Sequence, residues 1–350
     1  MGPARRETAR PPRGLRKAAL AVLAFSLAVL GSAMAQDPAP HAIDIPRWFT
    51  ESFLDLREDI RDAAAEGRRL MVYFGQDGCP YCTRLMTTSF SQRDIVAKTR
   101  RHFVAIALNL WGDREVTWVD GQVMSEKALA RNLGVQFTPT LLFFDEQGAV
   151  VARLNGYYPP HRLDAVLDYA ARGGARGQTL SEYLASAVKE PASPRLHAEP
   201  FFVAAPHDLS RRAGGKPLAV VFETPYCSAC DELHGEGFRR DEVRALLRRF
   251  DVAQLQPGTP ARLTTPDGRA TTAAAWAREL DVTYTPTIVF FDAGGKEVFR
   301  MEAYLRPFHL ASSFEYVAEA AYVAEPSFQR YIQGRAERMR ARGQRVDLWE

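Results

Sequence analysis

In the first half of the chain, segments with the hydrophobic spacing of helices alternate with short apolar runs typical of strands. Helical segments place apolar residues every three or four positions, whereas strands are short apolar runs bounded by turn-forming residues. The pattern predicts helix, strand, helix, strand, helix, two strands joined by a turn, and a last helix. These elements are expected at Phe49–Arg68, Arg69–Phe74, Tyr81–Ser89, Phe103–Leu108, Ser125–Leu133, Thr140–Asp145, Ala149–Leu154 and Leu163–Ala171.

The same order returns in the second half, which indicates a tandem duplication. Its elements are expected at Leu218–Phe222, Asp241–Phe250, Val252–Leu255, Thr272–Leu280, Thr287–Asp292, Glu297–Glu302 and Ala311–Ala321. Both halves therefore predict an α/β domain with a central mixed sheet flanked by helices.

The length of 350 residues favours two domains. We expect the first over residues 36–175 and the second over 201–334. Residues 176–200, rich in Gly, Ala and Pro around a short helix near Leu180–Val188, form the linker. The basic tail at 335–350 is expected to be a solvated helix.

Residues 1–35 predict a signal peptide. Six basic residues and one acid precede an apolar run at Ala18–Leu30, and Ala33-Met34-Ala35 offers a cleavage site after Ala35. The apolar run is shorter than the ~20 residues that a membrane span needs. The chain holds 45 basic and 42 acidic residues, so cleavage leaves 39 and 41, a net charge of −2. We therefore expect export, to the periplasm or otherwise, and no nucleic-acid partner.

The chain has four cysteines, and all four lie in Cys-x-x-Cys pairs. Each pair is followed by a Thr-Pro-Thr segment, with 60 residues from first cysteine to proline in one half and 59 in the other. The pairs are Cys79-Pro80-Tyr81-Cys82 and Cys227-Ser228-Ala229-Cys230, and the segments are Thr138-Pro139-Thr140 and Thr285-Pro286-Thr287.

Each cysteine pair is expected where the first core strand meets a helix. Thiolates are the reactive form of cysteine, and the N-terminus of a helix lowers the pKa of a thiol placed there. A second cysteine one turn along can attack a mixed disulfide. We therefore predict that Cys79 and Cys227 are nucleophiles and that Cys82 and Cys230 are resolving thiols.

With these motifs, each half resembles the thioredoxin fold over roughly 120 residues. The resemblance implies that Pro139 and Pro286 are cis and face the cysteine pairs. It also implies that the backbone at Thr138 and Thr285 pairs with an extended substrate segment. The stretch Leu108-Asn109-Leu110-Trp111-Gly112-Asp113 makes the first half similar to exported SoxW-type thioredoxins associated with sulfur-compound oxidation.

Two departures from the family pattern concern charge. The buried Asp found six residues before the first cysteine of thioredoxin is replaced by Tyr73 and Val221. Asp77 and Glu223 lie nearer the pairs and could substitute, although surface positions are expected for both. The first half resembles the thioredoxin family more closely and is expected to hold the main catalytic site. The two cysteine pairs are expected to differ in reduction potential.

Other interpretations stay open. The pairs could form one Cys₄ zinc site, although 144 residues separate them, or they could be structural disulfides. A thiol-dependent copper-binding module is an alternative function, as is a peptide-binding protein with one idle half. His234 could reach a thiol or a metal, but a surface or partly packed position is expected, and Trp111 and Trp118 could line a groove or serve packing.

The favoured function is that of an exported thiol–disulfide oxidoreductase acting on cysteine-containing proteins through mixed disulfides. The reductase direction is favoured, and no bound cofactor or metal is expected. A reductase outside the cytoplasm needs electrons, so a membrane electron donor is the expected partner. Reductase, oxidase and isomerase share the same residues, and the sequence leaves the direction of exchange open.

Overall fold

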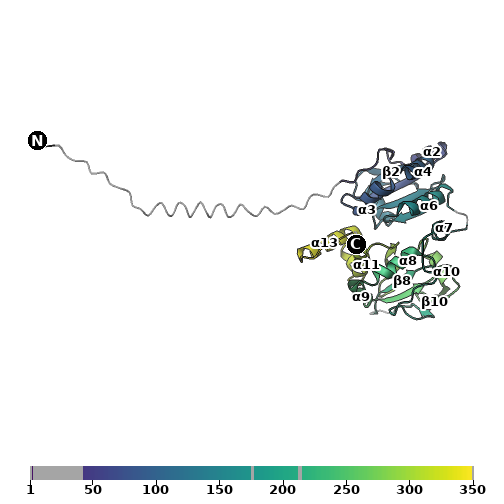
Figure 1. Ribbon diagram of the computed structural model, residues 1–350, viewed down its shortest axis with the longest axis vertical. Coiled ribbons are helices and arrows are strands. Elements are labelled where there is room, and N and C mark those ends of the chain that lie inside the picture. The colour runs from purple at the N-terminus through teal and green to yellow at the C-terminus, as the bar shows by residue number, and fades with distance from the viewer. Residues whose placement is uncertain (1, 3–41, 175–176, 212–214, 349–350) are drawn as a thin grey trace. The chain divides into compact units, whose positions relative to one another are not determined.

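The computed structural model describes Gly2 and residues 42–174, 177–211 and 215–348. Apart from Gly2, the predicted signal peptide lies outside these residues. Residues 42–350 form one compact unit that contains both predicted halves. Its order of strands and helices is shown in Figure 1.

The first half is built on a four-stranded mixed sheet. Its strands are β1 (Arg69–Gly75), β2 (Phe103–Asn109), β5 (Thr140–Phe144) and β6 (Val150–Asn155), in the order β2-β1-β5-β6. β1 runs parallel to β2 and antiparallel to β5. Met71 and Tyr73 pack into the core on one face, and Leu70, Val72 and Phe74 into the core on the other. Burial on both faces explains why this strand is a continuous apolar run.

Helices cover both faces of the first sheet. They are α2 (Leu56–Ala65), α3 (Pro80–Arg84), the π turn η1 (Leu85–Ser89), α4 (Arg93–His102), α5 (Glu126–Asn132) and α6 (Pro160–Ala171). Buried residues of α2 and α5 share one core, whereas those of α3, η1, α4 and α6 share the other. A hairpin of β3 (Glu115–Thr117) and β4 (Val123–Ser125) follows β2.

The second half repeats this sheet. Its strands are β8 (Leu218–Phe222), β9 (Asp251–Leu255), β12 (Thr287–Phe291) and β13 (Glu297–Glu302), in the order β13-β12-β8-β9. The helices are α8 (Ser228–Glu232), the π turn η2 (Leu233–Gly237), α9 (Asp241–Leu247), α10 (Ala273–Glu279) and α11 (Pro307–Ala318). A small sheet joins β7 (His207–Asp208), β10 (Arg262–Thr264) and β11 (Ala270–Thr272). The predicted fold class, two α/β repeats with mixed central sheets, is confirmed.

Further helices follow the last helix of each half. α7 (Leu180–Ala187) follows α6, whereas α12 (Ala321–Ala324) and α13 (Phe328–Ala341) follow α11. α7 and α13 are equivalent, because each begins after a hydroxyl N-cap, Thr179 or Ser327. The hydroxyl of Tyr169 donates to the carbonyl of Gln178, just ahead of α7, and the hydroxyl of Tyr316 donates in the same way ahead of α13. The duplicated unit therefore includes this helix.

Two expectations about the elements were wrong, and a third holds only in part. The first helix begins at Leu56 and not at Phe49, because Asp55 caps it by accepting hydrogen bonds from the backbone of Arg57 and Glu58. Helix α4 was not predicted. The tail is solvated only in part, because Arg335 in α13 is 3% exposed and Ala336 is also buried, whereas residues 337, 338 and 340–345 are exposed.

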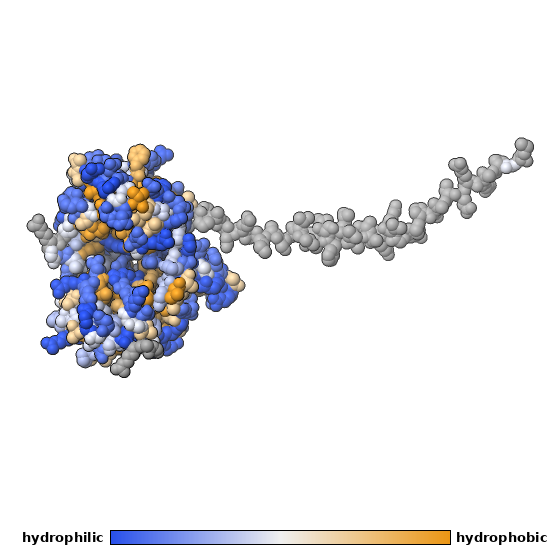
Figure 2. Space-filling model, turned by 180° about the vertical axis from the view of Figure 1, so that it is seen from behind, coloured by the Kyte–Doolittle hydropathy of each residue, from blue (hydrophilic) through white to orange (hydrophobic). Residues whose placement is uncertain are grey.

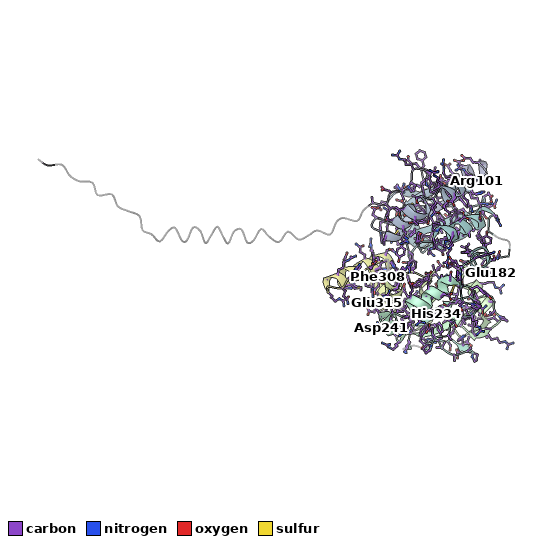
Figure 3. The ribbon with its side chains drawn as sticks, in the orientation of Figure 1. Arg101, Glu182, His234, Asp241, Phe308 and Glu315 are labelled. Atoms are coloured by element: carbon purple, nitrogen blue, oxygen red, sulfur yellow. A yellow bond between two sulfur atoms is a disulfide. The ribbon has the colours of Figure 1, made fainter. Side chains whose placement is uncertain are left out.

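Tertiary ion pairs explain the burial of Arg335. The Nε of Arg335 lies 3.0 Å from Glu315 Oε2 of α11, and its other guanidinium nitrogen pairs with Glu242 of α9. Figure 3 labels Glu315 on α11. The basic residue is therefore neutralised by two carboxylates of the second half, which is how a buried charge is tolerated.

Candidate functional site

The first cysteine pair lies at the N-terminus of α3, which follows β1 in the chain. Cys79 is the N-cap residue of α3, and the backbone N–H of Cys82 donates a hydrogen bond of 3.1 Å to the Cys79 sulfur. The two cysteines form a disulfide. The N–H groups and the dipole at this helix end favour a thiolate on Cys79 after reduction.

The second pair has the same local geometry. Cys227 caps α8, the N–H of Cys230 donates to the Cys227 sulfur over 3.1 Å, and the pair forms a disulfide. In both halves the Cα atoms of the pair are 5.2 Å apart. Each resolving cysteine therefore lies within reach of its nucleophile, as disulfide exchange requires.

Both Thr-Pro segments lie against the cysteine pair of their own half. The Thr138–Pro139 and Thr285–Pro286 bonds are cis. The Cys79 sulfur is 3.4 Å from the carbonyl oxygen of Thr138, and the Cys227 sulfur is 3.6 Å from that of Thr285. The structure thus brings together the residues that the sequence singled out, while their roles in catalysis stay predictions.

The threonine hydroxyls differ between the two sites. The hydroxyl of Thr138 donates to the Cys79 sulfur over 3.4 Å. The hydroxyl of Thr285 lies instead 3.0 Å from the hydroxyls of Ser181 and Thr224. The second sulfur therefore lacks the threonine hydrogen bond that the first sulfur receives.

The two nucleophiles also differ in exposure. Cys79 is only 4% exposed and Cys82 is fully buried. Cys227 is partly exposed, although Cys230 is buried. The second pair is therefore the more accessible in this conformation. Access matters because an attacking sulfur must reach its target.

The first site is covered by residues of the second half. The hydroxyl of Tyr81, between the first two cysteines, donates a hydrogen bond of 2.9 Å to the carbonyl of Leu348 and lies 3.5 Å from His309 Nδ1. The Tyr81 and His309 rings meet edge to face, with centroids 5.2 Å apart. Burial, with a smaller contribution from the charge of Arg335, lowers the pKa of His309 to about 4. His309 is therefore uncharged at neutral pH.

The second site is framed by residues of the first half and the linker. A pocket of about 50 Å³ is lined by Cys227, Arg162, Glu190 and Thr285, among others. The guanidinium of Arg162, from α6, donates to the hydroxyl of Ser228. That hydroxyl donates in turn to the carboxylate of Glu190. The dipeptide between the second two cysteines is thus held by an ion pair from outside its own half.

The contacts around the two sites are reciprocal. The backbone N–H of Ser181 in α7 donates to the carbonyl of Thr283, two residues before Thr285. The side-chain amide of Gln329 in α13 donates over 2.7 Å to the carbonyl of Gln136, two residues before Thr138. Each appended helix therefore contacts the cis-proline segment of the other half, where the family resemblance places substrate.

A buried cluster of charges in the second half was not predicted. Glu223 is 1% exposed and His234 is 3% exposed, so both surface expectations were wrong. His234 Nε2 lies 2.9 Å from Glu223 Oε1, and its Nδ1 lies 3.0 Å from Glu199 Oε1. Burial lowers the pKa of His234, but the two carboxylates outweigh that effect and the pKa lies above its usual value. His234 is labelled in Figure 3.

The other residues weighed in the sequence have structural positions. Asp77 is exposed and accepts a hydrogen bond from the backbone of Ile43, whereas Tyr73 fills the core. Trp111 donates to Gln76. Trp118 packs against Phe144, with ring centroids 5.8 Å apart.

Across residues 42–174, 177–211 and 215–348, no helix has the length and apolarity to cross a membrane. In that same part of the chain, no group of three or more His, Cys, Asp and Glu side chains is arranged to hold a metal ion. The face in Figure 2 is mainly hydrophilic, with scattered hydrophobic patches.

One signal in the sequence, the internal repeat, bears on the residues that contact each site from the other half. Arg162 and His309 occupy the same position in α6 and α11, because Pro160 and Pro307 open the two helices. The repeat identifies the two residues as equivalent. Nothing in the sequence, however, indicates that each reaches into the other half.

Comparisons with known proteins address the fold. None of the curated proteins matches the chain. Similar solved structures include a thioredoxin-fold protein from Helicobacter pylori, with 25% identity over 36% of this chain and 85% of that one. A thioredoxin from Thermus thermophilus shares 30% identity over 35% of this chain and 90% of that one, and a putative disulphide-isomerase from Bacteroides thetaiotaomicron shares 26% over 39% and 98%. The TM-score is 0.29 in each case.

A family model matches the chain twice. The model of the thioredoxin-like domain covers residues 56–171 and 210–318, one match in each half. Each match contains a disulfide-bonded Cys-x-x-Cys pair and the cis-proline segment beside it. The matches together span more than half of the chain, which therefore belongs to the thioredoxin-like domain family.

Proposed function

We propose that the protein is an exported thiol–disulfide oxidoreductase that exchanges disulfides with cysteine-containing proteins, with reduction of the substrate as the favoured direction. The observation that carries this proposal is the pairing, in both halves, of a helix-capping cysteine with a cis-proline segment less than 4 Å from its sulfur. This arrangement supports a role in which the sulfur reacts beside backbone groups that pair with an extended substrate.

The exchange follows from the geometry of the second pair. In the reduced protein, the Cys227 thiolate attacks one sulfur of a substrate disulfide, and the other substrate sulfur leaves as a thiolate that takes up a proton. The thiolate of Cys230 then attacks the Cys227 sulfur and releases the second substrate thiol. Two electrons pass to the substrate, and Cys227–Cys230 becomes a disulfide. A reductant outside this chain must restore the dithiol, and a membrane electron donor is the proposed source.

Exposure changes which half we propose as the main site. The sequence favoured the first half, but Cys79 is 4% exposed beneath Tyr81 and the residues that cover it. Cys227 is partly exposed in a pocket. We therefore propose that substrates meet the second pair in this conformation, and that the first pair reacts when its cover moves.

Export and the narrower family likeness belong to the same proposal. The basic, apolar and Ala33-Met34-Ala35 segments of the first 35 residues support cleavage and delivery to the periplasm or another exported compartment. The stretch that follows Leu108 supports a role like that of SoxW-type thioredoxins. N-terminal sequencing of the protein recovered from its native compartment tests cleavage after Ala35.

Trapping tests the exchange itself. In Cys82→Ala and Cys230→Ala variants the resolving thiol is missing, so a mixed disulfide with a substrate persists. We expect thiol-sensitive adducts on Cys227 in the second variant and fewer on Cys79 in the first. A double variant that also lacks the nucleophile, Cys227→Ala with Cys230→Ala, is the control. Absence of adducts from both single variants would refute the proposal.

The covered first site favours a second candidate function. If Cys79 never becomes accessible, the first half is idle and serves to bind peptides or to support the second half. Reductase assays with each pair removed separately distinguish the two possibilities. Activity that survives loss of Cys79 and Cys82 unchanged supports the idle half, whereas a reduced rate supports two working sites.

A further inference from the structure

The second cysteine pair is flanked by one positive and one negative side chain that its own half does not supply. Arg162 lies in the first turns of α6, and Glu190 lies after α7 in the linker. The side chain of Arg162 is 15% exposed and that of Glu190 is 25% exposed. Both line the pocket that contains Cys227.

These two residues form a closed network with Ser228. The Nε of Arg162 lies 3.1 and 3.0 Å from the two carboxylate oxygens of Glu190, and a second guanidinium nitrogen also pairs with that carboxylate. Both partners contact the hydroxyl of Ser228. Because Ser228 directly follows Cys227, the network fixes a full positive and a full negative charge next to the nucleophile.

The charges persist at neutral pH. Burial alone would raise the pKa of Glu190, but the hydrogen bonds from Arg162, Ser228 and His161 hold it at about 2. Burial likewise opposes the charge of Arg162, and the bonds to Glu190 outweigh it, so the pKa of the guanidinium is raised. Cys227 therefore shares its pocket with an ion pair whose two members act on a thiolate with opposite signs.

Other charged and titratable groups face the same helix end. Asp231 contacts His197, whose Nε2 lies 2.6 Å from Asp231 Oδ1. Burial raises the pKa of Glu232 on α8 and of Tyr284, which lines the pocket. Arg306 acts on Glu232 from the loop before α11, and exposed His161 contacts Glu190. None of these groups contacts Ser228 as Arg162 and Glu190 do.

The first site offers a comparison within the same molecule. His309 occupies the position equivalent to Arg162 and is uncharged at neutral pH. Pro80 replaces Ser228 and has no hydroxyl for such a network. The charge pair therefore belongs to the second site.

We propose that Arg162 and Glu190 are positioning residues that set the reactivity of Cys227 from outside its half, the guanidinium favouring the thiolate and the carboxylate opposing it. The second cysteine pair thus depends on the first half and the linker for its chemistry. This inference rests on the proposed function only in that Cys227 reacts as a thiolate.

Alkylation of the fully reduced, full-length protein tests this assignment without a substrate. Iodoacetamide at pH 7 reacts with the thiolate, and peptide mass spectrometry follows Cys227 and Cys79 in one sample. We expect Arg162→Met to slow alkylation of Cys227 about threefold, and Glu190→Gln to speed it by a similar factor, as single partly exposed charges do. The inflection of the rate with pH should move up in the first variant and down in the second.

Two further variants separate charge from structure. Arg162→Lys keeps the charge and should stay closer to the parent rate than Arg162→Met, and the double variant Arg162→Met with Glu190→Gln should lie between the single variants. The Cys79 rate should not change in any of them. Shifts in the same direction for Arg162→Met and Glu190→Gln, or no shift in either, would overturn the proposal.

The result is independent of the enzymatic proposal. Opposite shifts together with a failure to trap mixed disulfides would support this inference and contradict the proposed function. If Arg162→Met alters Cys79 as well, its fold is disturbed. Glu190→Gln and Arg162→Lys then decide the matter, and a Glu190→Gln rate no faster than that of the parent refutes the proposal.

Discussion

Arg162 and His309 stand at the same position of two equivalent helices, and each contacts the dipeptide between the cysteines of the other half. Arg162 of α6 donates to Ser228, whereas His309 of α11 lies 3.5 Å from the hydroxyl of Tyr81. One position of the duplicated unit thus carries a charged group at one site and a neutral group at the other.

This exchange of contacts makes the two halves dependent on each other. Asn155 of β6 donates over 2.6 Å to Glu302 of β13, and these two residues are themselves equivalent in the repeat. The same relationship holds for Ser181 of α7 and Gln329 of α13, which contact equivalent carbonyls. We therefore interpret the duplication as a pair of units that complete each other's sites.

Tyr81→Phe should expose the first cysteine pair. The substitution removes the hydrogen bond of 2.9 Å to the carbonyl of Leu348 together with the 3.5 Å contact with His309 Nδ1, and leaves the ring in place. A neutral hydrogen bond contributes about 1 kcal/mol, so the covered state should lose about fivefold in population relative to the open state. Reduction of Cys79–Cys82 by dithiothreitol should accelerate by about that factor. Tyr226→Phe, at an exposed tyrosine beside Cys227, is the matched control and should leave both rates unchanged.

His234 should make stability fall as the pH rises. Its pKa is raised in the folded protein, so the folded state binds more protons than the unfolded state between the usual value of 6.5 and the folded value. The stabilisation from the cluster is fully present below 6.5 and is lost as the pH rises through the folded pKa. Urea unfolding of the parent and of His234→Gln across this range should give curves whose difference shrinks with increasing pH.

Below pH 6.5, His234→Gln should lower the stability of the folded protein. His234→Gln leaves the buried carboxylate of Glu223 without its cation, and breaking a buried pair costs about 3 kcal/mol. Gln254, which donates to Glu223 Oε2 over 2.6 Å, would remain as a partner. A loss of stability that does not vary with pH would argue against a charged His234 in the folded protein.

His309 should change stability with pH in the opposite direction to His234, so that stability falls as the pH falls. Burial lowers its pKa to about 4, so the unfolded state binds more protons between about 4 and 6.5. Acidification from pH 7 to pH 5 should therefore cost about 2 kcal/mol through this residue. His309→Gln should remove that part of the acid sensitivity. Equal acid sensitivity in parent and variant would show that His309 is accessible to protons in the folded state.

Much of the fold could be predicted because its central strands are continuous apolar runs. β8 and β13 have the bounds expected from the sequence, and β1 and β2 extend one residue further. Helix α4 escaped prediction because its ten residues include five that are basic and bury only Ile95 and Thr99. The first helix was placed too early because Phe53 fits a helical spacing, although it is fully exposed and precedes Leu54 with φ 65°.

The candidate sites divide in the same way. Local spacing was enough to place each cysteine pair at a helix N-terminus, whereas its association with the proline segment came from the family resemblance. The cover over the first site includes the contact of Tyr81 with Leu348, which lies 267 residues further along the chain, and such contacts leave no periodic signal. Glu223 and His234 were misjudged because a charged residue is expected at the surface unless its partner is known.

The time course of reduction of the two disulfides tests the central claim most directly. Oxidised full-length protein is treated with dithiothreitol, samples are quenched with an alkylating reagent, and each pair is followed by peptide mass spectrometry. Because Cys227 is partly exposed and Cys79 is covered, we predict that Cys227–Cys230 is reduced first and that Cys79–Cys82 follows more slowly. Reduction of Cys79–Cys82 first, or of both pairs at the same rate, would contradict two exchange sites of unequal access.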